Sequence, residues 1–414
     1  MKRILTILIA SFAISCTDNS LEQWKGEDNP GGGNEPEERR EDTPVLSESQ
    51  RWAALADSCT HVLVDNFLDK KTGTFWSTPR DIEHGSQYIY WQQAHALDVI
   101  ISSYLRIKES NPALAATYLD YIGKWYDNDA NNYNNTHEAD GEYGGFFNDY
   151  TDDMCWICLT LMHMSDATAE EKYAETAKAV FDNYIWPRAT VGAKGLSLPW
   201  TCYDKDRENR NACTNAPACL AASLLYRHFS DEKYLETAKT LYKFNIANMA
   251  DAERVEEPPL SYTQGTFGEA ARQLFHITGN KSYMDKAGQV LLYCVNSNRT
   301  TSDGILRHEG TSMDQSLFKA VFIPYAVNYV LDPEADSARK TAIKEKLLLC
   351  AKKLDSNMDR RYYPQMFCDY FWGTTFTSGT ASMGAQASGA SLLEGVARMT
   401  AALESAEQKV NKAE

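Results

Sequence analysis

The stretch DEKYLETAKTLYKF, residues 231–244, has two close counterparts in this chain of 414 residues. They are EEKYAETAKAVFDNY at 170–184 and NKSYMDKAGQVLLY at 280–293. In each, a Tyr is followed four residues later by an Ala, which places both side chains on one face of a helix. The pairs are Tyr173 with Ala177, Tyr234 with Ala238, and Tyr283 with Ala287. Each stretch follows an apolar segment and a short polar turn, so the repeating unit is a helical hairpin.

The same pattern extends along most of the chain. It predicts twelve helices, beginning near residues 47, 91, 112, 152, 170, 212, 231, 262, 280, 315, 335 and 380. The helix that includes Trp156 is apolar nearly all round, as an inner helix should be, whereas those from Glu170 and Asp231 are amphipathic, as outer helices should be. Six hairpins predict an all-α fold, an (α/α)6 barrel, and the spacing leaves an open superhelix as the alternative.

The N-terminus reads as an export signal. MKRILTILIASFAISC has two basic residues, then an apolar run that is shorter than the about 20 residues needed to span a bilayer. Its AISC ending resembles the lipobox of bacterial lipoproteins. We therefore expect residues 1–15 to be a lipoprotein signal peptide and Cys16 to become the acylated first residue, with ordinary cleavage nearby as the alternative.

A tether and one large domain follow the signal. Residues 16–46 are rich in Asn, Gly, Pro and Glu and contain almost nothing that could form a core, so we expect a flexible acidic tether. Residues 47–405 contain no second linker and form the expected catalytic domain. We expect an exported monomer, attached to the outer membrane through Cys16 and displayed on the cell surface, with the periplasmic face as the alternative.

Charge and cysteine content narrow the function further. The net charge is −16, and loss of Lys2 and Arg3 with the signal makes it −18, which disfavours nucleic acid as a partner and favours a neutral substrate. Removing Cys16 leaves nine of ten cysteines, so at least one lacks a partner within the chain, and their connectivity stays open. Cys155 and Cys158 form a CxxC inside the apolar helical stretch MCWICLTLM, which favours core packing over redox or metal chemistry.

Aromatic and polar residues concentrate in the loops between the predicted helices. The loops are TGTFWSTP at 72–79, DGEYGGFFNDYT at 140–151, GLSLPWTCYD at 195–204 and RRYYPQMFCDYFWGTTF at 360–376. Aromatic rings provide platforms for sugar faces, and amides and carboxylates orient sugar hydroxyls. The collection favours a carbohydrate-binding cleft, although any one aromatic residue could simply cap the core.

Two adjacent carboxylates, Asp152 and Asp153, stand in FFNDYTDDMCW at 146–156. If Thr151 is the N-cap, both lie in the first turn of a helix, with Met154, Ile157, Cys158 and Leu161 behind them in the core. Acidic residues in a first turn are usually there because the helix dipole favours them. Two carboxyls this close also resist simultaneous ionisation, so one should keep a proton while the other ionises. A proton donor beside a nucleophile is what glycosidic cleavage with retention requires.

These residues resemble a known family. Phe147, Asn148, Asp149, Tyr150, Asp152, Asp153 and Trp156 are similar to the approximate signature NDYYDDxxW of glycoside hydrolase family 76, the α-1,6-mannanases. Further segments follow that family's order, from YWQQAH at Tyr90 through NACTNAPACLAASLLYR at Asn211 and SYTQGTFGEAARQLFHITGN at Ser261 to GILRHEG at Gly304 and DQSLFKAVFIPY at Asp314. The resemblance covers nearly all of residues 47–400.

The resemblance implies an (α/α)6 barrel, endo-acting hydrolysis of α-1,6-linked mannan with retention, and no metal or other cofactor. By position in the motif, Asp152 would be the nucleophile and Asp153 the general acid and base. Thr151 departs from the family, which commonly has a second Tyr there, and this could alter a sugar contact. The residues that we expect to line the cleft are Tyr90, Trp91, Asn148, Trp200, Asn215, Tyr262, Gln264, Asp314 and Gln315.

Other functions remain as alternatives. A non-catalytic mannan-binding lipoprotein would keep the cleft without cleavage, and a transglycosylase or another α-mannoside hydrolase would use the same fold. A zinc hydrolase is disfavoured because His137–Glu138 and His308–Glu309 each lack the second His of an HExxH motif. The sequence TASMG around Ser382 lacks the first Gly of a nucleophile elbow.

Overall fold

The computed structural model describes residues 46–79, 90–132 and 142–413, and this part contains twelve α-helices. Six of them form an inner set: α3 (Tyr90–Ile107), α5 (Thr151–Thr168), α7 (Ala212–Phe229), α9 (Ser261–Thr278), α11 (Met313–Leu331) and α13 (Met383–Ala413). Six form an outer set: α2 (Glu48–Phe67), α4 (Pro112–Asn132), α6 (Glu171–Val180), α8 (Glu232–Ala247), α10 (Lys281–Asn296) and α12 (Ser337–Asn357). Every helix begins within three residues of the predicted start.

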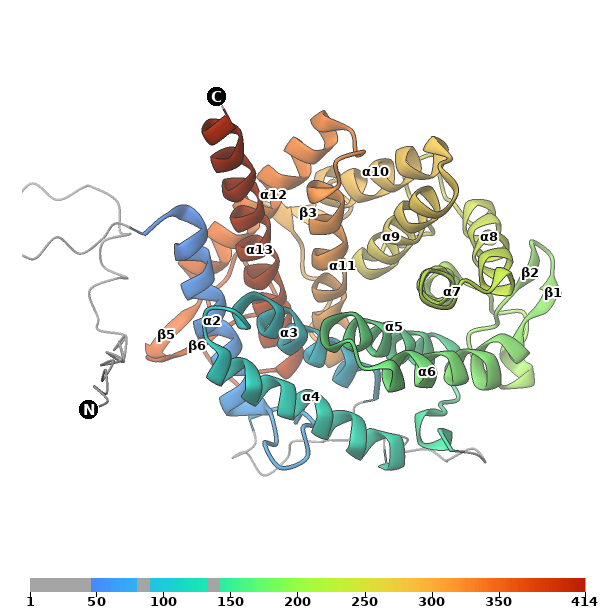
Figure 1. Ribbon diagram of the computed structural model, residues 1–414, viewed down its shortest axis with the longest axis horizontal. Helices are drawn as coiled ribbons and strands as arrows, with labels where there is room; N and C mark the ends of the chain where they lie inside the picture. Colours follow the sequence, from blue (N-terminus) through green and yellow to red (C-terminus); the bar gives the residue numbers. More distant parts are fainter. Residues whose placement is uncertain (1–45, 80–89, 133–141, 414) are drawn as a thin grey trace, which may run out of the picture. The chain divides into compact units, whose positions relative to one another are not determined.

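The inner helices form a closed ring. Each one contacts the next in chain order, and α13 returns to contact α3. The outer helices pack outside this ring, as α4, α6, α8 and α10 do in Figure 1. The contact between the first and last inner helices excludes an open superhelix and confirms the predicted (α/α)6 barrel.

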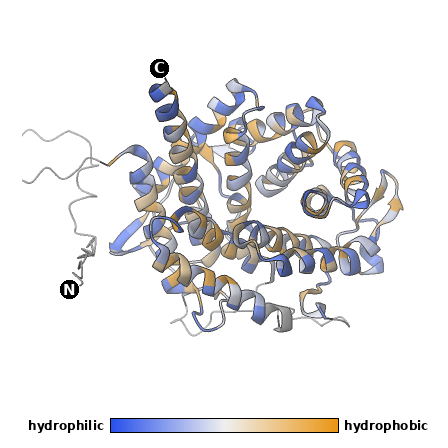
Figure 2. Cartoon of the chain, in the orientation of Figure 1, coloured by the Kyte–Doolittle hydropathy of each residue, from blue (hydrophilic) through white to orange (hydrophobic). Residues whose placement is uncertain are grey.

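Burial separates the inner helices from the outer ones. In α5, the four residues predicted to lie behind the carboxylates are completely buried, namely Met154, Ile157, Cys158 and Leu161. Cys155 is also completely buried, so both cysteines of the CxxC belong to the core. The Tyr of the repeat is buried in α6 and α8, where Tyr173 and Tyr234 are each 1% exposed. Hydrophilic and hydrophobic residues alternate along the helices in Figure 2, as expected where one side of a helix is buried.

The loops that enter the inner helices gather at one end of the barrel. Three of them contain short antiparallel hairpins: β1 (Thr190–Gly192) with β2 (Gly195–Ser197) before α7, β3 (Thr301–Ser302) with β4 (Ile305–Leu306) before α11, and β5 (Asp359–Tyr362) with β6 (Gln365–Phe367) before α13. Rings from the first two turns of inner helices meet at this end, since Trp91 of α3 lies 6.2 Å from Phe318 of α11. The barrel therefore presents the N-termini of its inner helices together.

The signal peptide predicted at residues 1–15, Cys16 and the tether up to residue 45 lie outside the described residues. Among the helices that the structure does describe, none combines the length and the hydrophobicity needed to cross a membrane.

Candidate active site

The second residue of four inner helices is one of the predicted site residues. Trp91, Asp152, Tyr262 and Asp314 hold this position in α3, α5, α9 and α11. Because the six N-termini gather at one end of the ring, these side chains converge. The ring of Trp156, one turn further along α5, lies 6.4 Å from Trp91 and 5.5 Å from Tyr262. The structure thus joins the carboxylates to an aromatic cluster.

Asp152 is buried, with 9% of its surface exposed, and two N–H groups bind its carboxylate. The indole Nε1 of Trp200 donates to Oδ2 at 3.1 Å, and the backbone N–H of Asp153 donates to Oδ1 at 3.1 Å. Burial raises the pKa of Asp152 to about 7, while these donors act in the opposite direction by stabilising the charged form. Asp152 is therefore the carboxyl of the pair that is better prepared to ionise.

Asp153 lies in a different environment. It is half-buried, and no group in the described part of the chain donates a hydrogen bond to its carboxyl. Burial, followed by the charges of Asp152 and Asp314, holds the pKa of Asp153 well above its ordinary value. At neutral pH the proton shared by the pair therefore belongs on Asp153, which gives one proton donor next to one carboxylate.

A third carboxylate approaches the pair from the opposite side of the ring. Asp314 is exposed at the start of α11, and its charge raises the pKa values of both Asp152 and Asp153. The side-chain amide of Gln92 donates a hydrogen bond to Asp314 and so links α3 to α11. Asp314 is thus held near the pair with a surface that water or a sugar hydroxyl can reach.

The segment before α5 pairs with the segment that carries Trp200. Tyr150 and Thr201 form an antiparallel bridge, in which the N–H of Thr151 donates to the carbonyl of Trp200 at 2.8 Å. The rings of Tyr150 and Trp200 meet edge to face, with centroids 5.1 Å apart. This pairing brings the Trp200 indole to Asp152, although 48 residues separate them in the chain.

The prediction that Thr151 caps α5 is wrong. Tyr150, whose backbone is extended, is the N-cap, and Thr151 is the first helical residue. Thr151 is completely buried, and its hydroxyl accepts a hydrogen bond of 3.1 Å from Arg188. Asp152 and Asp153 nevertheless occupy the first turn, as predicted.

Arg188 organises the whole segment and was missed by the sequence analysis. Its guanidinium donates to the carbonyls of Asn148 at 2.7 Å and Asp149 at 2.9 Å, and it lies 5.2 Å from the centroid of the Phe147 ring. No local pattern around WPR at 186–188 indicated this role, because its partners lie about 40 residues earlier.

Tyr90 and Asn148 support the same loop. The hydroxyl of Tyr90 donates to the carbonyl of Phe146 at 2.5 Å, and the side-chain carbonyl of Asn148 accepts from the N–H of Tyr150 at 2.8 Å. Tyr90 is 6% exposed and Asn148 is 3% exposed. The structure therefore places both residues behind the aspartate pair, where they fix the backbone.

Asn215 and Gln264, also predicted to line the cleft, are completely buried and hold loops instead. The amide of Asn215 binds the N–H and carbonyl of Leu198 at 2.9 and 3.0 Å, and the amide of Gln264 binds those of Val255 at 3.1 and 2.8 Å. Each is the fourth residue of its inner helix. The fourth residues of α3 and α13, Gln93 and Gln386, bind loop backbone in the same way.

Gln315 completes a capping box at the start of α11. Its backbone N–H binds the hydroxyl of Ser312 at 3.2 Å, and its side-chain oxygen faces the N–H of Ser312 at 3.4 Å. A Cβ at Gly310 would lie 1.8 Å from the same side-chain oxygen, so the loop passes directly over Gln315. This contact places Gln315 in helix capping.

Glu309 and Phe318 are two further residues of the site that were not among the predicted site residues. The ring of Phe318 packs against that of Tyr262 at a tilt of 33°, with centroids 4.3 Å apart, which extends the aromatic cluster to α11. The carboxylate of Glu309 accepts hydrogen bonds from the N–H of Ser261 at 2.7 Å and from its hydroxyl. Burial raises the pKa of Glu309 to about 7. Glu309 thus caps α9 directly before Tyr262.

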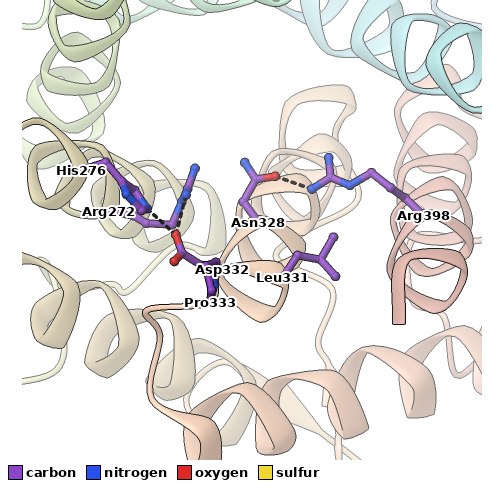
Figure 3. Close-up of a pocket in the computed structure, with 7 residues that line it drawn as sticks. All are labelled: Arg272, His276, Asn328, Leu331, Asp332, Pro333 and Arg398. Atoms are coloured by element: carbon purple, nitrogen blue, oxygen red, sulfur yellow. Dashed lines mark hydrogen bonds and ion pairs between the residues drawn. The ribbon is translucent and has the colours of Figure 1, made fainter. Parts of the chain in front are cut away.

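A hollow of about 260 Å³ lies elsewhere, among residues near the C-terminal ends of α9 and α11 and in α13 (Figure 3). Arg272 pairs there with Asp332 and Glu269, both at 2.7 Å, and Arg398 donates to the side chain of Asn328. Cationic groups at helix C-termini offset the partial negative charge of the carbonyl ends. These ionic contacts therefore close the opposite end of the ring, and the hollow among them is separate from the aspartate pair.

An (α/α)6 barrel with a carboxyl pair in unequal environments fits a glycoside hydrolase, which uses one proton donor and one carboxylate. The sequence matches the model of glycosyl hydrolase family 76 over residues 51–407, so the chain belongs to this family and is a glycoside hydrolase. No curated protein matches the chain.

Solved structures share the fold. One is an inactive variant of the α-1,6-mannanase of Salegentibacter sp. HEL1_6, with two consecutive aspartates replaced, in complex with α-1,6-mannotetrose; it is 23% identical, with a TM-score of 0.72, and the match covers 84% of this chain and 99% of that chain. Another is the family 76 mannosidase Bt3792 of Bacteroides thetaiotaomicron VPI-5482, 17% identical, with a TM-score of 0.68 and coverage of 86% and 100%. The Lin0763 protein of Listeria innocua is 22% identical, with a TM-score of 0.69 and coverage of 84% and 98%.

Proposed function

We propose that this protein is a retaining endo-α-1,6-mannanase in which Asp152 is the nucleophile and Asp153 the general acid and base. The observation that carries the proposal is the unequal environment of the two carboxyls. Trp200 and the helix backbone stabilise the charge on Asp152, whereas Asp153 has no such donor among the described residues. Inactivation of the Salegentibacter mannanase by replacing two consecutive aspartates, and its complex with α-1,6-mannotetrose, support the same pair and the same substrate class here.

The chemistry follows from these positions. Asp153 donates its proton to the glycosidic oxygen while the Asp152 carboxylate attacks the anomeric carbon, which gives a covalent mannosyl-enzyme and releases the first product. Once its proton is gone, Asp153 accepts one from water, and that water hydrolyses the intermediate. Phe318, half-buried beside the buried rings of Trp91 and Tyr262, provides an apolar ring face on which a mannose can pack.

Digestion of linear α-1,6-mannan tests the activity. Purified protein should release a ladder of manno-oligosaccharides, and the first product should carry the α configuration by proton NMR. Asp152→Asn and Asp153→Asn should each lower kcat at least about 10³-fold. Asp204→Asn, at an exposed carboxylate of the same loop region, is the matched control and should keep wild-type activity.

Azide distinguishes the two roles. In Asp152→Gly, azide takes the place of the missing nucleophile and should give an inverted β-mannosyl azide from an activated aryl α-mannoside. In Asp153→Gly, azide attacks the covalent intermediate and should give the retained α-mannosyl azide. If the two variants gave azide products of exchanged configuration, the roles of Asp152 and Asp153 would be reversed. Mannan binding without any cleavage by the wild-type protein would favour a non-catalytic binding protein.

We also propose that the protein is exported and anchored to the outer membrane through acylated Cys16. The signal-like sequence of residues 1–15 and the tether that follows support this placement. Metabolic labelling with an alkynyl fatty acid should tag the wild-type protein and leave Cys16→Ser untagged. Protease treatment of intact cells then distinguishes surface display from the periplasmic face.

A further inference from the structure

Two cysteines from distant parts of the chain lie in contact. Cys59 in α2 and Cys368, directly after β6, have their Sγ atoms 3.6 Å apart, and their side chains are buried at 0% and 2% exposure. A disulfide bond is about 2.05 Å long, so the sulfur atoms need to approach by roughly 1.5 Å. Cys155 and Cys158, by contrast, both belong to the same helix, α5.

The surrounding residues hold the two cysteine backbones in place. The side-chain carbonyl of Gln386 accepts from the N–H of Cys368 at 3.1 Å, and its amide donates to the carbonyl of Cys59 at 3.1 Å. A Cβ at Gly389 would lie 2.3 Å from the sulfur of Cys368, so this glycine provides the space that the sulfur occupies. Gln386 and Gly389, both in α13, thus hold the two cysteines in contact.

The same burial decides when a bond could form. Contact with Cys368 and burial hold the pKa of Cys59 well above its ordinary value, and the thiolate is the form that reacts. Neither sulfur is accessible to an oxidant in the folded barrel. Oxidation therefore has to occur while the chain folds, before α13 closes over the pair.

We propose that Cys59 and Cys368 form an intramolecular disulfide when the chain folds in an oxidising environment. With oxidised glutathione, one cysteine thiolate displaces a glutathione thiolate to give a mixed disulfide, and the second cysteine displaces the other. Two protein thiols and one glutathione disulfide become one protein disulfide and two glutathione thiols. The bond ties the first outer helix to the loop that leads into the last inner helix, where the ring closes.

Peptide mapping of the full-length chain tests the proposal. The chain is refolded in a mixture of oxidised and reduced glutathione, blocked with an alkylating agent, and digested with trypsin without reduction. Cleavage after Arg51, Lys70, Arg361 and Arg398 gives peptides 52–70 and 362–398, each with a single cysteine. Mass spectrometry should find them linked, and eight of the ten thiols should react after denaturation. Ten reactive thiols, or a different linked pair, would overturn the proposal.

Thermal unfolding with and without reductant gives a second readout. The oxidised wild-type protein should melt about 5 °C above its reduced form. In Cys59→Ala this difference should disappear. Cys219→Ala, which removes a buried thiol bonded to the carbonyl of Ala238, is the matched control and should retain both the linked peptides and the difference. If Cys59→Ala does not fold, the peptide map of the wild-type protein decides alone.

Discussion

The indole N–H of Trp200 donates a 3.1 Å hydrogen bond to Oδ2 of Asp152, across a bridge between two loops. Burial alone would raise the pKa of this carboxyl further than the value of about 7 that it reaches, because Trp200 stabilises the ionised form. In the proposed mechanism Asp152 acts as a carboxylate. Trp200 therefore favours the ionised form of the nucleophile.

Trp200→Phe should shift the acidic limb of the pH profile of kcat/KM. Phe retains a ring for contact with Tyr150 but has no N–H, so the pKa of Asp152 should rise by about one unit. The loss of activity should be about 10-fold at pH 6 and smaller at pH 8. Tyr150→Phe keeps the indole bond and should leave the limb in place. An unchanged limb in Trp200→Phe would mean that the bond does not control ionisation of Asp152.

Arg188→Met should lower both kcat and stability. The substitution removes three hydrogen bonds to the segment before Asp152 and leaves the carbonyls of Asn148 and Asp149 without this donor. We expect a loss of about 2–4 kcal/mol in the free energy of unfolding and a fall in kcat of about 10²-fold. Free guanidinium at millimolar concentration should restore part of the kcat.

Thr151 supplies the matched comparison for Arg188. Thr151→Ser keeps the hydroxyl that accepts from Arg188 and should stay close to the wild-type protein, whereas Thr151→Val should cost about 1 kcal/mol. Equal stabilities of the Ser and Val variants in urea unfolding would show that the hydroxyl contributes nothing. Because Thr151 is completely buried, neither variant should change KM for manno-oligosaccharides.

The sequence predicted the barrel well because helix periodicity is local. The spacing of Tyr234 and Ala238 places both side chains on one face of α8, and both are buried there. The polar turn before them marks the hairpin. The aspartate pair was also found, because the apolar residues directly after it predict a helix whose first turn contains the pair. Arg188 could not be found in this way, because its meaning depends on a loop about 40 residues away that only the folded chain brings near.

The predicted cleft residues show a second limit. The family resemblance suggested that these residues contact the sugar, yet the second and fourth positions of the inner helices point to different surroundings. Asp314 in second position is exposed near the pair, whereas Gln264 in fourth position is completely buried against Val255. Residue type alone does not separate these roles, since an amide binds a sugar hydroxyl and a backbone peptide with the same atoms.

Gln264→Leu should destabilise the fold without a specific effect on substrate binding. Leucine fits the volume but leaves the N–H and carbonyl of Val255 buried and without the amide partner, which should cost about 2–4 kcal/mol. Urea unfolding measures the cost, and KM for manno-oligosaccharides at 20 °C should stay within about twofold. Gln264→Glu keeps an oxygen that accepts from the N–H of Val255 but loses the amide that donates to the carbonyl of Val255. A large rise in KM with unchanged stability would return Gln264 to the substrate site.

Asp153→Asn should stabilise the protein more at pH 8 than at pH 5. The folded pKa of Asp153 lies well above its ordinary value of about 4, so between these values the folded chain holds a proton that the unfolded chain releases. Its stabilising contribution is fully present below pH 4 and is lost as the pH rises toward the folded pKa, by at most about 1.4 kcal/mol per pH unit. Asn carries no such proton and avoids this loss.

The measurement is the difference in Tm between Asp153→Asn and the wild-type protein across pH 5 to 8. We expect this difference to grow by several degrees as the pH rises, because each pH unit adds to the cost of keeping the Asp153 carboxyl neutral. Asp204→Asn, which removes an exposed carboxylate away from the pair, is the matched control. A flat difference for Asp153→Asn would show that Asp153 ionises normally in the folded barrel, and its role as the proton donor would then be lost.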